Sequence, residues 1–461
     1  MSASSVPLTN TAPQSLDAIG QDVERTAKRY RSWFWGAIAI IAGYLIISWF
    51  QFEVGSLRDK WRPDRASLFV LDTYAHKDHI TMRWTEPGEV RVAFEGGHRQ
   101  VYDPKPEWFS EDADGGQTVT FGNGGRVTFY DTEITLDWPD QDEVFRFRLN
   151  ANGKPVAVGY ESRPEGLPSW MRQTENKIEI RPSLYERLQV GTNRIEAHRY
   201  AVGWKYFWFD FDSPLVDVGI VSAIGLMFSS DRVVPNMSNA ALVWTEFRDN
   251  TLWGHGTVLY AMLETIFMAL LGTMIAAGVG LPLAFLAARN IQPFGFLRFC
   301  LRRLFDVLRG IDTLIWSLIF LRAFGPGLFT GIFAIAFTDT GTLGKLMSEA
   351  IENADGKQVE GIKSTGARKV QQHRFGILPQ IMPVFISQSL YYLESNTRGA
   401  VIIGAMGAGG IGLQFLGALQ TGNDFENVAY MALLVLGTVV AMDALSARLR
   451  RALIGIEPAS D

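Results

Sequence analysis

The chain has 461 residues, of which 47% are hydrophobic, and its formal net charge at pH 7 is −5. The apolar residues are concentrated in long stretches, whereas residues 51–215 have the composition of a soluble protein. That soluble region carries a net charge of −6 and the remainder carries +1. Neither value is typical of a nucleic-acid-binding protein, which shows a basic stripe, so we expect no nucleic-acid partner. The composition predicts one membrane domain interrupted by one soluble domain.

The N-terminal segment, residues 1–32, is polar and precedes the first apolar run. Residues 33–50 contain no charged side chain and have Trp and Phe at both ends, which predicts a membrane-spanning helix with aromatic side chains at the interfaces. No small-residue cleavage site follows this run, so we expect a retained anchor and not a cleaved signal peptide. Four basic residues before the run predict a cytoplasmic N-terminus by the positive-inside rule: Arg25, Lys28, Arg29 and Arg31.

The soluble region, residues 51–215, contains a series of short segments rich in β-branched and aromatic residues. These segments are 68–71, 79–84, 90–94, 118–121, 127–130, 134–138 and 144–149. Turn signals such as Pro87-Gly88 and Asn152-Gly153 separate them, which predicts an antiparallel, β-rich inserted domain. Two further segments, 177–180 and the aromatic run 204–211, are candidates for additional strands.

Residues 216–250 are expected to form an interfacial segment. The apolar run 216–228 has only 13 residues and contains Asp217, which favours an interfacial or re-entrant segment over a span and leaves open whether it enters the membrane. Five spans are then expected within 251–452, at 258–287, 311–320, 328–337 with a polar continuation to 349, 381–403 and 428–444. With the first helix, the sequence predicts an all-α membrane domain of about six transmembrane helices and a cytoplasmic tail at 453–461.

The charges of the loops give an independent test of orientation. Loops 288–309, 350–379 and 446–461 are rich in Lys and Arg, whereas the loop 404–427 contains neither. Positive charge accumulates on the cytoplasmic side, so the first three loops are expected inside and the fourth outside. This orientation places both termini in the cytoplasm and the β-rich insert on the extracytoplasmic side.

The loop before the fifth expected span carries a recognisable pattern. Glu360 is followed by Gly366 and then, after eleven residues, by Leu378-Pro379. This pattern resembles the EAA loop of ABC importer permeases, which reads E-A-A, three residues, G, nine residues, and I-x-L-P. The sequence departs from that pattern at two places, because Gly361-Ile362 stand where it has alanines and Gly376 stands where it has isoleucine.

Segments flanking this loop, at 343–353, 394–398 and 404–412, extend the resemblance. Over about 250–452 the chain resembles the permease subunits of phosphonate-type ABC importers, which lie in the bacterial inner membrane. The resemblance implies a transporter subunit and not an enzyme: two permease subunits, this chain and a copy or relative, form the pathway. It also implies three kinds of partner. Separate ATPase subunits bind ATP and Mg, an extracytoplasmic binding protein delivers the substrate, and membrane lipid surrounds the helices. The insert at 51–215 is not part of the usual pattern, and its role is left open.

The local chemistry of the loop is compatible with a docking element. Ile362, Gly366 and Val370 recur at i, i+4 and i+8 among basic residues, Asp355 can cap the first short helix, and Gly366 permits a sharp turn. The alternative is a solvated basic loop that follows the positive-inside rule. The resemblance assigns the coupling to the ATPase to Glu360, Ile362, Gly366, Val370, Leu378 and Pro379.

A glycine-rich turn lies between the last two expected spans. Its members are Gly404, Gly407, Gly409, Gly410 and Gly412. The run lacks the Lys-Ser/Thr ending of a phosphate-binding loop, so we expect a tight turn or close helix approach and no nucleotide. The motif G-x-x-x-x-G-K-[ST] occurs nowhere in the chain. ATP hydrolysis is therefore expected in a partner subunit, and no cofactor or metal is expected in this chain.

Charged residues within apolar stretches are candidates for the translocation pathway because they are costly in a membrane. Five residues qualify, namely Glu264, Asp312, Asp339, Glu394 and Arg398, and Glu264, Asp312, Glu394 and Arg398 are the pathway candidates. Glu394 and Arg398 are spaced i, i+4, so they either neutralise each other or leave Arg398 to contact an anionic substrate.

His76 and His79 have the spacing of some metal sites, but on a strand they would point to opposite faces. A second function class also remains open, a membrane-anchored sensor or channel that uses the β-rich domain. That alternative explains the insert but not the EAA-like loop. Among importers, phosphite, phosphate esters and other small anions are alternative substrates.

Overall fold

The computed structural model describes residues 16–61, 63–94, 101–112, 114–139, 141–160, 166–421 and 425–455. The start of the expected N-terminal segment, 1–15, and most of the expected tail, 456–461, lie outside these residues. The chain divides into two compact units, Met1–Ser67 and Leu68–Asp461.

The first unit is dominated by one long helix. Helix α1, Leu16–Gln51, contains the expected first span and is long and apolar enough to cross a membrane over Glu24–Gln51. A 3-10 turn, η1 (Val54–Ser56), and a short helix, α2 (Leu57–Lys60), follow it. Aromatic side chains such as Trp33, Trp49 and Phe50 on α1 are exposed, as side chains that contact lipid must be.

Helix α3, Pro63–Tyr74, leads into the strands and corrects one prediction. Residues 68–71, expected as a strand, are helical, and Leu71 is fully buried. A run of four apolar residues fits either a strand or one turn of a helix, so the sequence could not decide between them.

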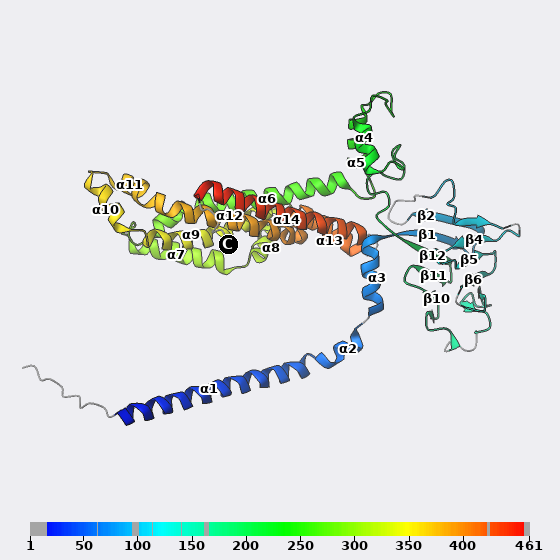
Figure 1. Ribbon diagram of the computed structural model, residues 1–461, viewed down its shortest axis with the longest axis horizontal. Coiled ribbons are helices and arrows are strands. Elements are labelled where there is room, and N and C mark those ends of the chain that lie inside the picture. The colour runs from blue at the N-terminus through cyan, green and yellow to red at the C-terminus, as the bar shows by residue number, and fades with distance from the viewer. Residues whose placement is uncertain are drawn as a thin grey trace, which may run out of the picture. The chain divides into compact units, whose positions relative to one another are not determined.

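Twelve strands form two antiparallel sheets of six strands each among the described residues (Figure 1). The first sheet has the order β2-β1-β12-β11-β10-β9 and the second the order β3-β4-β5-β6-β7-β8. The strands are β1 Ala75–Arg83, β2 Glu86–Phe94, β3 Phe109–Glu111, β4 Gln117–Thr120, β5 Arg126–Phe129, β6 Ile134–Asp137, β7 Phe145–Leu149, β8 Pro155–Ala157, β9 Met171–Gln173, β10 Lys177–Ile180, β11 Glu186–Gly191 and β12 Arg194–Val202.

The two sheets share one hydrophobic core. Alternate residues of each strand are buried, as in β7, where Phe145 and Phe147 are buried and the arginines between and after them are exposed. Ile80 and Ile195 of the first sheet join Phe147 of the second in this core. This period of two is typical of a sheet with one face in the core and the other in water.

The aromatic run 204–211 does not add a strand. Its side chains instead pack just before helix α6, His255–Ala287, and on helix α14, Phe425–Ile454, where Trp204 and Phe207 contact Trp253 and Tyr430. His255 links the same groups, because its ring nitrogens lie 2.8 Å from the Tyr430 hydroxyl and 2.6 Å from the Phe207 carbonyl oxygen. This aromatic cluster joins the β-rich region to the helical bundle.

The segment 216–250 forms a helical hairpin of α4, Ile220–Met227, and α5, Asn239–Arg248. Only eight residues of the expected interfacial run are helical in α4, which is about 12 Å of helix and too short to span a membrane. The buried Asn239 amide group holds the turn together by donating to the carbonyls of Leu226 and Asp231.

The remaining helices run side by side as a bundle (Figure 1). They are α6 His255–Ala287, α7 Gly295–Gly310, α8 Thr313–Phe324, α9 Leu328–Glu352, α10 Gly356–Ser364, α11 Lys369–Gln372, the π-helical turn η3 His373–Ile377, α12 Leu378–Ile403, the π-helical turn η4 Gly404–Ala408, α13 Ile411–Thr421 and α14 Phe425–Ile454. Helices α6, α8, α9, α12 and α14 overlap the five segments that were expected as spans after the insert, and α8 begins only after Ile311 and Asp312.

Glycines let the central helices approach closely. A Cβ atom on Gly272 of α6 would lie 2.7 Å from Ile335 of α9, and one on Gly341 of α9 would lie 2.7 Å from Leu308 of α7. Small residues at such crossings are typical of helices that pack in a membrane, where close backbone approach replaces the hydrophobic driving force.

Three helices among the described residues are long and apolar enough to cross a membrane, namely Glu24–Gln51, His255–Ala287 and Phe425–Leu453. A bent pair, Lys369–Ala408 with Ile411–Thr421, raises the number to four. The expected count was about six. The shortfall arises because α8 has only 12 residues, about 18 Å of helix, and because the C-terminal half of α9 is polar.

Candidate functional site

The loop between α9 and α12 folds as a small helical element at one end of the bundle (Figure 1). As expected, Asp355 caps its first helix, α10, because the Asp355 carboxylate accepts a hydrogen bond from the Lys357 amide at 2.9 Å. Glu360 lies on α10 and is exposed to solvent. The loop therefore begins with a helix whose first turn is stabilised by an N-cap hydrogen bond.

Gly366 ends α10 in a left-handed conformation, with φ of +83°. The chain turns sharply there, and α11 starts at Lys369. The predicted stripe of Ile362, Gly366 and Val370 on one helical face is therefore wrong, because the helix is interrupted between them. Ile362 is half-buried and lies close to Gly376, whereas Val370 is 77% exposed.

The departure from the EAA pattern at Gly376 has a structural reason. A Cβ atom on Gly376 would meet the Cα and Cγ2 atoms of Val359 at 3.3 Å and Ile362 Cδ1 at 3.4 Å. Gly376 therefore lets the π-helical turn η3 lie directly against α10. An isoleucine at this place would push α10 away from its present position.

Gln380 connects α10 to α12. Its side-chain oxygen accepts a hydrogen bond from the Asp355 amide at 2.8 Å, and its side-chain nitrogen donates to the Gly376 carbonyl at 2.5 Å. Leu378 and Pro379, the end of the EAA-like pattern, form the first turn of α12. Gln380 was not predicted as a functional residue, although it directly follows the Leu378-Pro379 pair.

The loop is also packed onto the ends of α6 and α9. Ile377 and Ile381 share a buried cluster with Ala284 of α6 and with Met347 and Ile351 of α9, and Val359 of α10 packs against this cluster. Displacement of α10 would therefore act on three helices at once. Structures packed this closely transmit small shifts without absorbing them.

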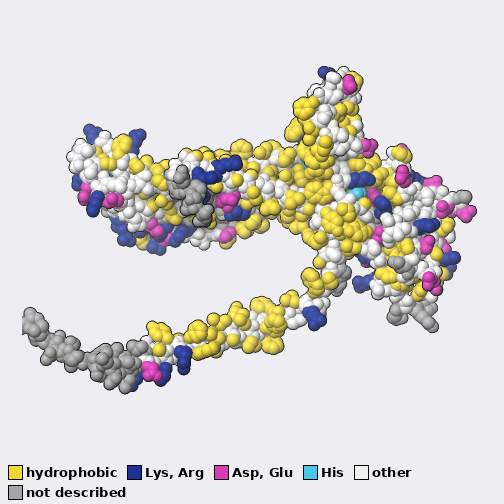
Figure 2. Space-filling model, viewed as in Figure 1, with side chains coloured by type: hydrophobic (Ala, Val, Ile, Leu, Met, Phe, Trp, Pro, Cys, Tyr) yellow, Lys and Arg dark blue, Asp and Glu magenta, His cyan; other side chains and the backbone are white. Residues whose placement is uncertain are grey.

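The solvent-exposed surface of the loop combines apolar and basic side chains. Val370 and Phe375 are 77% and 59% exposed. Lysines and arginines gather at this end of the bundle, whereas hydrophobic side chains dominate its middle (Figure 2). Exposed apolar side chains within a basic rim form a surface suited to another protein.

The glycine-rich turn contacts Glu264, although the sequence analysis treated the turn and this pathway candidate separately. The Glu264 carboxylate on α6 accepts a hydrogen bond from the Gly410 amide at 3.1 Å, and Thr265 accepts one from the Ile411 amide at 2.9 Å. These bonds cap the N-terminus of α13 from a neighbouring helix, where a negative charge is favourable. Glu264 thus holds the turn and does not stand alone in an open channel.

The glycines themselves allow the chain to reverse within a small space. Gly410 has φ of +71°, and a Cβ atom on it would overlap Thr265 Oγ1. A Cβ atom on Gly412 would overlap the Val401 carbonyl oxygen, and one on Gly404 would overlap that of Gly409. Gly407 also has a positive φ. The segments on either side of the turn are bent by 64° relative to each other.

The other pathway candidates have local partners. Asp312 is the N-cap of α8 and accepts a hydrogen bond from the Leu314 amide at 2.8 Å. Arg398 donates to Glu394 at 2.9 Å on the same face of α12, which is the pairing that the i, i+4 spacing predicted. Half of the Arg398 side chain is still exposed, so this ion pair is accessible from outside the chain.

A buried polar cluster lies between α6, α9 and α12. The Asn396 side chain donates to Asp339 at 2.5 Å and to Thr273 at 2.8 Å, and Asp339 is only 5% exposed. The sequence marked Asp339 as a charge in an apolar stretch but not its partners. Asn396 lies within the segment 394–398 that carried the resemblance, which is the signal that could have identified it.

His76 and His79 do not form a site together. His76 contacts the Gly203 carbonyl at 3.0 Å and stacks on Phe94, whereas His79 stacks on His198 of the neighbouring strand.

Comparison with known proteins assigns the helical part. Residues 280–454 match the family described as "Binding-protein-dependent transport system inner membrane component". The chain is also 30% identical over 256 residues to the phosphite transport system permease protein PtxC of Stutzerimonas stutzeri, an alignment that covers 55% of this chain and 91% of that protein. The chain belongs to the family of ABC importer permeases.

Other relatives of this permease have related names. The phosphate-import permease protein PhnE of Mycolicibacterium smegmatis is 31% identical over 235 residues, which are 51% of this chain and 44% of that protein. The putative cryptic phosphonate transport system permease protein PhnE2 of Escherichia coli is 45% identical over 118 residues, or 26% of this chain and 96% of that protein. The resemblance to phosphonate-type permeases is confirmed by these relatives. One solved structure, an inward-facing MetNI methionine ABC transporter, aligns with 43% of this chain and 96% of its own at a TM-score of 0.39 and 20% identity.

The family match of this permease begins within α6, so all twelve strands precede it. As the family description states, the permease is an inner membrane component, and its helical part supplies several apolar helices.

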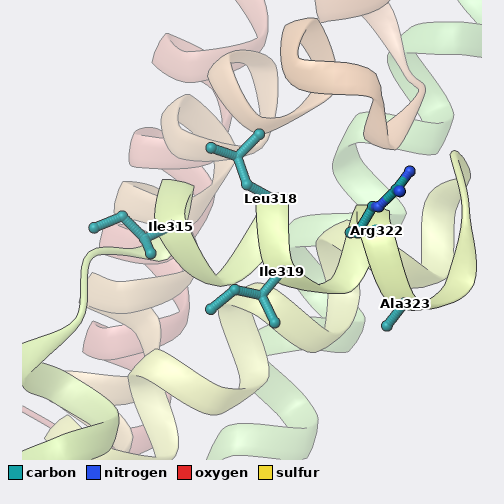
Figure 3. A pocket seen from close by; sticks show the side chains of 5 residues that line it. All are labelled: Ile315, Leu318, Ile319, Arg322 and Ala323. Carbon is teal, nitrogen blue, oxygen red and sulfur yellow. The ribbon is translucent and has the colours of Figure 1, made fainter.

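The permease also carries an apolar depression on α8 (Figure 3). It is lined by Ile315, Leu318, Ile319, Arg322 and Ala323. Because all five residues belong to one helix, the depression is an open surface and not an enclosed binding site. Apart from the Arg322 guanidinium, its lining side chains are apolar, which suits contact with lipid or with another helix.

Proposed function

We propose that this permease imports phosphonates or similar phosphorus-containing anions across the bacterial cytoplasmic membrane. The names of its relatives support this class of substrate, since phosphite, phosphate and phosphonate are all tetrahedral phosphorus oxyanions. The selectivity within this class would be set largely by an extracytoplasmic binding protein that delivers the substrate.

The proposed topology has six spans, α1, α6, α8, α9, α12 and α14, with both termini in the cytoplasm and the β-rich region outside. The distribution of Lys and Arg among the loops supports this orientation. Helices α8 and α9 are included because they pack on each other, with the rings of Phe320 and Phe337 5.0 Å apart. A short helix that packs on a longer one can cross a membrane that is locally thin.

The coupling element of the transporter is the loop 350–379. We propose that it docks on separate ATPase subunits, which bind ATP and Mg, through the exposed side chains of α10 and α11. Closure of the ATPase dimer would press on α10, and the Gln380 hydrogen bonds and the packing of Gly376 would pass this movement to α12. The observation that carries this proposal is the packing of α10 against η3, together with the hydrogen bond that joins Asp355, the N-cap of α10, to Gln380 in the first turn of α12. A second permease subunit, either a copy or a relative of this chain, would complete the pathway.

The test combines co-purification with transport. The permease is expressed with the ATPase encoded nearest to its gene, and we expect the two to purify together. Glu360→Arg reverses a charge on the proposed docking helix, and Gly366→Pro cannot adopt the positive φ of this turn. Both variants are expected to abolish uptake of a phosphonate while the permease still reaches the membrane.

Unchanged uptake in both variants would contradict the coupling role. Failure of the ATPase to co-purify with the permease would favour the alternative function, a membrane-anchored sensor or channel that uses the β-rich region. Uptake of an unrelated anion with the coupling variants inactive would instead retain the transport mechanism and correct only the substrate class.

A further inference from the structure

Two neighbouring strands of the β-rich region bring three possible metal ligands together. His79 on β1 lies directly opposite His198 on β12, and Glu196 lies two residues before His198 on the same strand. Residues spaced by two share one face of a strand, so all three side chains lie on the same face of the sheet. The alternate residues Ile80 and Ala197 face the core and are fully buried.

The geometry of the three side chains is close to that of a ligand set. One ligand atom from each residue lies within 4.8 Å of those of the other two. The imidazole rings stack with centroids 4.4 Å apart, and His79 Nε2 lies 3.9 Å from the nearer Glu196 oxygen. Tetrahedral zinc with bonds of about 2.1 Å needs ligand atoms about 3.4 Å apart. Rotation of the two rings on their fixed strands would close this difference.

The two imidazoles have ring nitrogens that lack a partner within the described part of the chain. His79 Nε2 and His198 Nδ1 are both buried and accept or donate no hydrogen bond there. His198 is 6% exposed and Glu196 8%. A buried polar atom without a protein partner is rare in a folded protein, and such an atom usually contacts an ordered water or an ion.

The protonation state of the histidines suits a cation. Burial, and secondarily the neighbouring His79, lowers the pKa of His198 to about 2. Burial also lowers the pKa of His79, against a smaller opposite effect of Glu196. Burial therefore disfavours the protonated, cationic form of both imidazoles, and the metal site itself rests on the geometry described above.

We propose that His79, Glu196 and His198 bind a divalent transition-metal ion of the zinc type. Two imidazoles and one carboxylate are a ligand set preferred by Zn²⁺ and its neighbours in the first transition row, and not by Mg²⁺ or Ca²⁺. Three protein ligands leave a fourth position for water or for a group from another molecule. The His79 side chain is 30% exposed, which gives the ion a route of entry.

Arg194 competes with the ion for Glu196. Its Nε atom lies 2.6 Å from a Glu196 oxygen, and its side chain is 64% exposed. Because Arg194 is mostly in solvent, it can turn away when a metal binds. Removal of this competing cation is therefore expected to strengthen metal binding, whereas it would only weaken a cluster held together by ion pairs.

The experiment measures Zn²⁺ binding to the full-length permease in detergent, purified through a tag without histidine. Titration against a chromophoric zinc chelator is expected to show one Zn²⁺ per chain. His79→Gln and Glu196→Gln should each weaken binding at least about tenfold, and Arg194→Gln should strengthen it several-fold. The matched control is His76→Gln on the same strand, which should leave the affinity unchanged.

The Arg194→Gln arm keeps the test decisive if a ligand variant is unstable, because a gain in affinity cannot result from misfolding. Substitution of Co²⁺ for Zn²⁺ gives a second readout, since four-coordinate cobalt has strong visible absorption that His79→Gln should remove. Absence of stoichiometric binding by the unmodified chain, or equal binding by His79→Gln, would overturn the proposal.

Discussion

The β-rich region and the helical bundle distribute their large and small side chains in opposite ways. In the β-rich region the large residues Phe129, Phe147 and Leu136 are fully buried. In helix α6 most of the buried positions are small, such as Ala269, Gly272 and Ala276, with Met268 as a large exception, whereas Phe267 and Met274 are 53% and 59% exposed.

The difference is the one expected between a region that folds in water and a region that folds in lipid. A soluble sandwich is stabilised mainly by removing large apolar side chains from water. Helices in lipid gain little from burying such side chains, so they place small residues at their contacts and leave large ones outside. Replacing a large apolar residue by alanine should therefore destabilise the β-rich region strongly and the exposed side of α6 only weakly. Enlarging a small residue at a helix contact should destabilise the bundle.

The largest expected effect on stability is in the β-rich core. Phe147→Ala should destabilise this region by about 3–5 kcal/mol, because it removes a buried ring and leaves a cavity. Phe267→Ala on the exposed side of α6 should cost less than about 1 kcal/mol in detergent. Protease resistance of each region in increasing urea measures both effects. A large effect of Phe267→Ala would contradict the lipid-exposed position of this side chain, because it would show that Phe267 is packed against another part of the protein.

A smaller effect is expected from adding a methyl group between helices. Gly272→Ala places its new Cβ 2.7 Å from Ile335, which should cost about 1–3 kcal/mol by overpacking. The matched control is Gly278→Ala on the same helix, whose Cβ would have no neighbour within 4 Å. Thermal unfolding in detergent should therefore separate the two alanine variants, and equal melting temperatures would contradict the proposed tight packing of α6 on α9.

In the loop 350–379, which we call the coupling loop, a glycine variant can likewise be compared with a matched control. Gly366→Ala should strain the turn by about 1–2 kcal/mol, because φ is +83° there. Gly361→Ala lies within α10, meets nothing within 4 Å and should stabilise that helix by up to about 1 kcal/mol. Phosphonate uptake is expected to fall in the first variant and to persist in the second. The reverse order would show that the turn at Gly366 is not needed for coupling.

The smallest stability effect concerns the ion pair on α12. Arg398→Gln and Glu394→Gln should each change stability by less than about 0.5 kcal/mol, because the pair is spaced i, i+4 and half of the arginine is exposed. We expect uptake to continue at a similar rate, since the structure pairs the two residues with each other. Loss of uptake in a normally folded Arg398→Gln variant would instead assign Arg398 to the substrate pathway.

Local patterns predicted much of the fold. The alternating segments 79–84, 134–138 and 144–149 overlap strands β1, β6 and β7, and the long apolar runs overlap α6, α12 and α14. The prediction was wrong for residues 68–71, where four apolar residues fit both a strand and a helix, and for 204–211, whose aromatic residues pack between regions.

Contacts between distant segments could not be predicted from the sequence. The bond between Glu264 and Gly410 and the cluster of Asp339 with Asn396 each depend on how helices cross. The pairing of His79 with His198 depends on the register between the first and last strands of the region. Spacing along the chain carries no information about such registers, so the sequence could not identify His198 as the neighbour of His79.

The cytoplasmic location of the loop 350–379 is the claim on which the coupling proposal depends, and cysteine labelling tests it most directly. Single cysteines are introduced at Val370 in the loop and at Glu143 in the β-rich region, with Cys300→Ser as background, and intact cells are treated with a membrane-impermeant thiol reagent. Both positions are exposed, so each will react where the reagent can reach it. The proposed topology predicts that Glu143→Cys is labelled in intact cells and Val370→Cys only after the membrane is opened. Labelling of Val370→Cys in intact cells would contradict it, because a cytoplasmic ATPase could not then reach the loop.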